Sequence, residues 1–154
     1  GIYDRTLLII TGDHGEEFYE HGAWGHGHSL YNEVLQVPLI IKFPGDRYSG
    51  QTISAPACLA DILPTILEAA GVPVSAGDFD GRSLLPLLDG KNNGRPEILA
   101  DVGAGILENH VPQKSALISG KNKLILNRPF SPADRAFYKF PPPGWPLPAP
   151  AQIT

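Results

Sequence analysis

Residues 6–17 read TLLIITGDHGEE, and they contain the transition from strand to loop that sets the fold. The first six, 6–11, are apolar and rich in β-branched side chains, the pattern of a strand buried on both faces. The run stops at Gly12, and Asp13 and His14 follow directly. Ligands of open α/β sheets bind beyond the carboxyl ends of the strands, so this pattern predicts a functional loop.

Helix and strand signals alternate along the rest of the chain. They predict a short helix at 29–36, a strand at 37–43, a helix at 62–70, a brief helix at 84–88, a strand at 97–102 and a β-hairpin at 114–127. The helix at 62–70 has the strongest signals, because Asp61 occupies the N-cap position, Pro64 the first turn and Gly71 the position after its end. This order predicts the α/β class: a layered sheet with flanking helices and a small C-terminal antiparallel hairpin element.

The amino-acid composition changes after residue 127, where proline becomes frequent. Half of the 16 prolines of the chain lie between Pro129 and Pro150, a density that prevents regular helices and central strands. We therefore expect residues 1–127 to belong to one folded domain and residues 128–154 to form an extended Pro-rich tail. The first strand has no partner before it, so we expect the sheet to be completed by chain N-terminal to Gly1.

Composition excludes several classes of function. The formal net charge of −4 and the pI of 5.7 give no basic field for nucleic acid. No apolar run approaches the roughly 20 residues that span a bilayer. Cys58 is the only cysteine, so there can be no intrachain disulfide. The compartment stays open between periplasmic or secreted and cytoplasmic.

Four of the five histidines lie within fifteen residues that begin with His14. A carboxylate beside an imidazole is half a site for a divalent cation: both suit Mn, Zn or Fe, while the carboxylate also suits Ca or Mg. A helix cap with a surface imidazole is the simpler interpretation of Asp13 and His14. The spacing of His26 and His28 leaves open whether both serve one site.

A series of short motifs in a fixed order resembles the sulfatase branch of the alkaline phosphatase superfamily. The motifs are DHGE at 13–16, EHG at 20–22, GHGHSLY at 25–31, VPLII at 37–41, DILPTIL at 61–67, DGRSLLPLL at 80–88 and GKNKLI at 120–125. The ordered series, which covers roughly residues 1–127, is more specific than any one piece. It implies a partial alkaline-phosphatase-like fold and the C-terminal portion of a sulfatase catalytic domain.

The resemblance implies a metal-dependent hydrolysis of a small anionic ester, in which a nucleophile attacks sulfur or phosphorus and a divalent cation stabilises the transition state. Asp13 and His14 match the second pair of metal ligands. Calcium is the first expectation for a sulfatase, with Mn, Mg and Zn open. Many members place a lysine where this chain has GHGH. We expect His26 to take that role as a cationic contact or general acid, with His28 as the second candidate.

The family's nucleophile motif and its other metal carboxylates normally lie far upstream, and this chain contains neither. We therefore expect the segment to be inactive alone and to need the N-terminal half of its parent chain. Phosphoesterase, phosphonate hydrolase or phospho-group transferase chemistry, and a non-catalytic relic domain, are the alternatives. We interpret Glu16, Glu17 and Glu20 as a solvated loop, and Trp24 and Tyr31 as packing residues.

Overall fold

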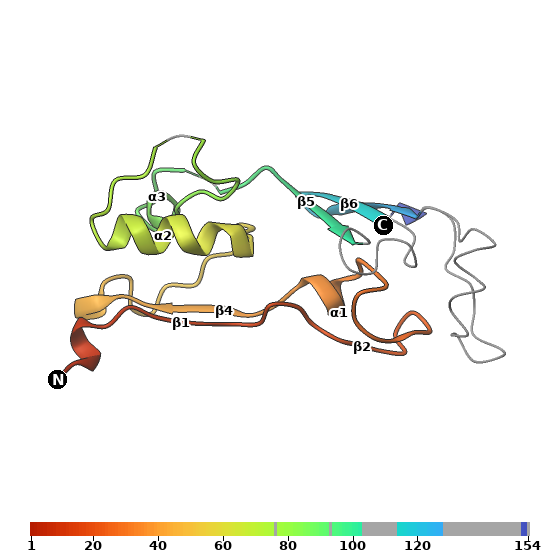
Figure 1. Cartoon of the computed structure of the whole chain (residues 1–154), viewed down its shortest axis with the longest axis horizontal. Helices are drawn as coiled ribbons and strands as arrows, with labels where there is room; N and C mark the ends of the chain where they lie inside the picture. Colours follow the sequence, from red (N-terminus) through yellow and green to blue (C-terminus); the bar gives the residue numbers. More distant parts are fainter. Residues whose placement is uncertain (76, 93, 103–113, 128–151, 154) are drawn as a thin grey trace. The chain divides into compact units, whose positions relative to one another are not determined.

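The computed structural model describes residues 1–75, 77–92, 94–102, 114–127 and 152–153 (Figure 1). The chain divides into two compact units. The first comprises Gly1–Asp13 and Pro38–Pro96, and the second comprises His14–Val37 and Glu97–Thr154. The chain passes from the first unit into the second between Asp13 and His14, at the beginning of the predicted functional loop.

Two predicted strands pair in the first unit. β1 (Leu8–Thr11) and β4 (Leu39–Lys42) are antiparallel, with Ile9 opposite Ile41, and Figure 1 draws them side by side in red and orange. Short 3₁₀ turns, η1 (Tyr3–Arg5) and η2 (Pro44–Asp46), flank the pair. The Lys42 ammonium donates to the carbonyl of Tyr3 at 2.5 Å, which fixes η1 against the end of β4.

The expectation that the first strand is buried on both faces is wrong for the described residues. Ile10 is 53% exposed, and Ile40, its partner on β4, is 60% exposed. Within the part of the chain that the structure describes, β4 is the only hydrogen-bonded neighbour of β1. A two-stranded ribbon leaves apolar faces uncovered, because a strand needs a layer on each side to be buried.

The helical part of the first unit follows the prediction closely. It comprises η3 (Leu59–Asp61), α2 (Ile62–Ala69) and α3 (Leu85–Leu88). Gly71 ends α2 in the left-handed region at φ 73°, as the sequence predicts. The buried Thr65 hydroxyl donates to Asp61 O at 2.6 Å and accepts from Leu84 N at 2.9 Å, so one side chain joins α2 to the segment that begins α3.

Asp61 does not cap α2 with its side chain, in contrast to the prediction. Its carboxylate instead accepts from Cys58 N at 2.9 Å and from Arg82 N at 2.8 Å, and it forms a buried ion pair with Arg95. The carboxylate therefore fastens the loop before α3 and the chain around residue 95 to the turn that precedes α2.

The second unit contains a four-stranded antiparallel sheet in the order β5-β6-β7-β8. Its strands are β5 (Glu97–Val102), β6 (Lys114–Ser119), β7 (Asn122–Asn127) and β8 (Gln152–Ile153). This confirms the predicted strand at 97–102 and the hairpin at 114–127. The mixture of helices and sheets agrees with the expected α/β class.

The core of the second unit lies between its sheet and the chain around α1 (Asn32–Leu35). Leu30, Ala116 and Ile125 are buried together, with Tyr31, Leu35, Ala100 and Val102 packed against them. The predicted helix at 29–36 is shorter than expected, because Tyr31 has extended dihedral angles, φ −72° and ψ 165°, at the N-cap.

The predicted tail falls almost entirely outside the described residues, which include only residues 152–153 of it. The boundary between 127 and 128 therefore stays a prediction. Among the described helices, none has both the length and the apolar character needed to cross a bilayer.

Candidate functional site

A small hairpin that immediately follows β1 in sequence positions the candidate side chains. β2 (Glu17–Phe18) pairs antiparallel with β3 (Trp24–Gly25), so that Glu17 lies opposite Gly25. Tyr19 and Gly22 both have positive φ in the turn, at 71° and 86°. The next cross-strand pair outward is Glu16 with His26, and directly opposed residues of antiparallel strands place their side chains on one face.

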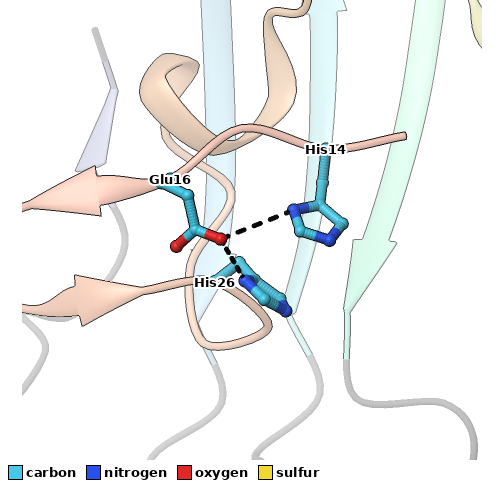
Figure 2. A group of neighbouring side chains, drawn as sticks. All are labelled: His14, Glu16 and His26. Atoms are coloured by element: carbon cyan, nitrogen blue, oxygen red, sulfur yellow. Dashed lines mark hydrogen bonds and ion pairs between the residues drawn. The ribbon is translucent and has the colours of Figure 1, made fainter. Parts of the chain in front are cut away.

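His14, Glu16 and His26 gather on that face, as Figure 2 shows. His26 Nδ1 donates to Glu16 Oε1 at 2.6 Å, and His14 Nδ1 lies 4.0 Å from the same oxygen. The two imidazole rings are 3.8 Å apart between centroids and tilted by 30°. His14 shares the face with Glu16 because it precedes it by two residues, the period of an extended chain. All three side chains are substantially exposed to solvent.

Glu17 occupies the opposite face, and its interpretation as part of a solvated loop is wrong. The residue is fully buried. Its Oε1 accepts from the backbone amides of His21 at 3.2 Å and Ala23 at 2.9 Å. Its Oε2 accepts from His28 Nε2 at 2.9 Å and from the Ser29 hydroxyl at 3.1 Å. Four donors therefore surround this carboxylate.

These donors determine the charge of Glu17. Burial alone raises the pKa of a carboxyl group, but the hydrogen bonds from His28, Ala23 and Ser29, and the charge of His28, outweigh burial and lower the pKa of Glu17. The carboxylate is thus ionised and structural. It ties the turn of the hairpin to the segment that precedes α1.

His26 and His28 serve different carboxylates. The chain turns at Gly27, whose φ of 78° lies in the left-handed region. His26 consequently faces Glu16, while His28 faces the buried Glu17. Each imidazole therefore has its own carboxylate partner in the structure.

Lys114, at the beginning of β6, contacts the segment that contains His28. The sequence analysis did not predict this role. It is 5% exposed, and its ammonium donates to the carbonyl of His28, 86 residues away in sequence. Burial lowers the pKa of Lys114, opposed by the charge of Glu17. In the sequence this residue is only a polar position that begins a strand, so only the tertiary contact distinguishes it.

A second group, Glu17, His21 and Glu33, also brings potential ligand atoms within 4.8 Å of one another. His21 stacks on Tyr31, with ring centroids 3.6 Å apart and planes at 6°, and its Nδ1 donates to Glu33. Both oxygens of Glu17 already accept two hydrogen bonds each, so a cation there would have to displace them. We interpret this group as a packed polar network.

Two further features hold the loop in place. Gly15 N donates to Val34 O at 2.8 Å, and a Cβ at Gly15 would lie 2.0 Å from the carbonyl oxygen of Glu33. Glycine is needed at this position because the backbone approaches α1 so closely. Trp24, 56% exposed, packs edge-on against Phe18 across the hairpin, with ring centroids 5.0 Å apart.

In the structure His26 lies beside His14, whereas His28 contacts the buried Glu17. Asp13 is exposed and is the last residue of the first unit. Its cooperation with His14 in one metal site stays a prediction from the sequence.

Comparison with known proteins finds similarity to sulfatases. The sulfatase family model matches residues 1–72, which include β1, the whole hairpin, β4 and α2. Arylsulfatase K of Danio rerio is 40% identical over 88 residues, and the N-acetylglucosamine-6-O-sulfatase of Bacteroides thetaiotaomicron is 39% identical over 89 residues. Over residues 1–72 the chain is similar to the sulfatase family, and these relatives support the resemblance to the alkaline phosphatase superfamily.

The match covers 57% and 58% of this chain but 16% of each of these relatives. A multifunctional alkaline phosphatase superfamily protein of Trinickia caryophylli, PehA, is 42% identical over 90 residues, which are 57% of this chain and 17% of that protein. The chain thus spans about a sixth of the length of the curated relatives that it matches.

Solved structures extend the likeness to most of the chain. A protein in complex with its substrate D-glucosamine-2-N,6-O-disulfate superposes with a TM-score of 0.69 and 32% identity, over 82% of this chain and 26% of that one. A 2-O GAG sulfatase superposes with a TM-score of 0.67 and 25% identity, over 79% of this chain and 27% of that one. The family model ends at residue 72, so these two structures extend the likeness beyond the region that it matches.

Proposed function

We propose that the protein carrying this chain hydrolyses sulfate esters, and that this chain supplies part of its metal-binding and ester-binding groups. The observation that carries the proposal is the convergence of His14 and His26 beside the Glu16 carboxylate, on the loop that follows the first strand of a chain similar to the sulfatase family. Imidazoles in such a place can hold a cation, contact an anion or transfer a proton.

Asp13 and His14 are the proposed metal ligands from this chain. Metal dependence is general in the family. The donors fit a divalent cation, because the Asp13 carboxylate offers hard oxygens that suit calcium and the His14 imidazole suits manganese or zinc. When bound, the cation would neutralise charge on the ester oxygens. Calcium is the first ion to test, since the resemblance to sulfatases implies it.

Removal of both proposed ligands should abolish the response to metal. Saturating calcium or manganese should raise the melting temperature of the full-length protein by mass action, because the ion binds the folded state. The Asp13→Ala, His14→Ala double variant should show no shift. Glu20→Ala, an exposed carboxylate in the same loop, is the control and should keep it. A full shift in the double variant would remove both residues from the metal site.

His26 is the proposed contact to the ester, as a cation or a general acid. Two observations favour it over His28. The His26 ring is half exposed, at 50% of its side-chain surface, whereas the Nε2–H of His28 donates to the buried Glu17. A proton donor must reach the leaving oxygen of the substrate, and an imidazole held by a buried carboxylate is less able to do so.

Replacement of His26 should lower turnover. Loss of a general acid typically costs about 10²–10⁴-fold in rate. We expect His26→Ala to reduce kcat for an aryl sulfate within this range while metal content, measured by atomic emission, stays unchanged. His28→Asn should act mainly through stability, seen as a lower melting temperature. Full activity in His26→Ala would transfer the role to another residue.

The relatives suggest which esters to test first. One relative is named for the 6-O-sulfate of N-acetylglucosamine, and one structural neighbour holds a disulfated glucosamine. Sulfated amino sugars are therefore the first substrates that we propose, beside a generic aryl sulfate. Turnover of phosphate or phosphonate esters alone would establish the alternative chemistry, and no turnover of any ester would establish a non-catalytic chain.

A further inference from the structure

Two lysines of the antiparallel sheet each donate to a main-chain carbonyl of the segment that follows His26. The Lys114 ammonium, from β6, donates to His28 O, and the Lys123 ammonium, from β7, donates to Leu30 O at 3.1 Å. We propose that Lys114 and Lys123 are positioning residues, which hold this segment so that His26 is correctly placed for the ester. The inference rests on the proposed function, and it assigns no metal or ester contact to either lysine.

His28 links the contact of Lys114 to His26. Its carbonyl accepts from Lys114, and its Nε2 donates to the buried Glu17. Its Nδ1 lies 3.3 Å from the carbonyl of His26. His28 is therefore held at its main chain and at both ring nitrogens. A shift of its backbone would also move the residue that we propose for the ester.

The burial of Lys114 indicates that its charge and its donor group are both needed. The residue is 5% exposed, and lysine is almost never buried without a partner. Burial lowers the pKa of its ammonium, while the charge of Glu17 opposes this change. An apolar side chain could fill the same space without the cost of desolvating a cation. The lysine instead offers a donor to the His28 carbonyl and an opposite charge to Glu17.

The sheet face that carries the two lysines also packs on the segment. On each strand the lysine lies two residues from a buried apolar residue, so the four side chains share one face: Lys114 and Ala116 on β6, Lys123 and Ile125 on β7. The two apolar residues are buried with Leu30, which is 2% exposed. The ammonium groups bind the main chain where the apolar residues contact the Leu30 side chain, so both kinds of contact restrict the same segment.

Replacement of either lysine by methionine, which keeps the length of the side chain, should lower kcat of the full-length protein for an aryl sulfate. We expect a loss on the order of 10–100-fold, because a displacement of about 1 Å in catalytic geometry can cost about 100-fold. Lys121→Met is the matched control, since this exposed lysine lies in the turn of the same hairpin. It should keep the wild-type kcat. If Lys114→Met or Lys123→Met also keeps it, that lysine is not a positioning residue.

A double-variant cycle separates positioning from a loss of folded protein. If the lysines act through His26, then Lys114→Met and Lys123→Met should lower kcat much less in a His26→Ala background than in wild type. A loss by the same factor in both backgrounds would overturn the inference, since it would then come from stability or from another residue. Should Lys114→Met fail to fold, the cycle with Lys123→Met decides, because Lys123 is only partly buried.

The imidazole nitrogens report the same effect without turnover. In nuclear magnetic resonance spectra of the full-length protein with isotope-labelled histidines, the signals of His26 and His28 should shift in Lys114→Met and Lys123→Met. They should stay at their wild-type positions in Lys121→Met. Unchanged signals in the first two variants would contradict only the positioning role. Absence of ester hydrolysis by the wild type would contradict the proposed function and leave these spectra as the test of the inference.

Discussion

Asp61→Ala should lower the free energy of unfolding of the first unit by about 3–5 kcal/mol, the usual cost of removing one partner of a buried ion pair. Asp61 is fully buried, and Arg95 binds it through Nε at 3.1 and 3.0 Å and through Nη2. The variant would leave the Arg95 guanidinium and the amides of Cys58 and Arg82 without their acceptor in the interior.

The same contacts predict a dependence on pH. Burial raises the pKa of Asp61, but the hydrogen bonds from Arg95, Cys58 and Arg82, with the charge of Arg95, outweigh it and hold the pKa below its usual value of 3.8. A carboxyl group whose pKa is lower in the folded state stabilises the fold above its unfolded pKa. This stabilisation is lost as the pH falls through the folded pKa.

Urea unfolding of wild type and Asp61→Ala between pH 3 and pH 7 measures both effects. The difference in unfolding free energy between them should be largest near neutral pH and should shrink below about pH 4. Asp89→Asn is the matched control, because Asp89 pairs with Arg47 at 3.1 Å on the surface. Exposed pairs contribute little, so this variant should melt close to wild type. A similar loss in both variants would contradict the role given to Asp61.

Glu17→Ala should have an effect of similar size on the second unit. The substitution removes a fully buried acceptor from two backbone amides, the His28 imidazole and the Ser29 hydroxyl. Each buried donor left without a partner costs about 1–3 kcal/mol. We expect a total loss of about 3–5 kcal/mol after partial relaxation, with the hairpin opening first.

Hydrogen exchange of the amides of His21 and Ala23 checks this prediction locally, since both donate to Glu17. Their protection should fall strongly in Glu17→Ala and less in Glu17→Gln, which keeps one acceptor oxygen. Glu20→Ala, an exposed neighbour, should leave their protection unchanged. Because the pKa of Glu17 is lowered from 4.5, its contribution should also disappear as the pH falls below that value. Unchanged protection in Glu17→Ala would contradict a structural role.

The contrast between Glu16 and Glu17 shows why part of the site escapes sequence analysis. The two residues are identical and adjacent, yet one faces solvent beside two imidazoles and the other is buried. Strand alternation assigns them to opposite faces, but only knowledge of the hairpin register tells which face is inward. The sequence could therefore predict an acidic loop, but it could not show that Glu17 is the buried residue.

The amino-acid sequence by itself determined the α/β class, the strands around Ile9 and Ile41, the helix at 62–70 and the hairpin near residue 120. These features depend on local periodicity, turn residues and caps, which neighbouring residues encode. It also showed the resemblance to sulfatases, because a series of motifs in a fixed order can be recognised from the sequence alone.

Only the tertiary structure decided the partners of the charged groups. It joined Asp61 to Arg95, Lys114 to the His28 carbonyl, and His26 rather than His28 to Glu16. Asp61 and Arg95 are 34 residues apart and Lys114 and His28 are 86 apart, and contacts over such separations have no local sequence signal. A charge is buried where several donors converge on it, and that convergence depends on how distant segments fold together.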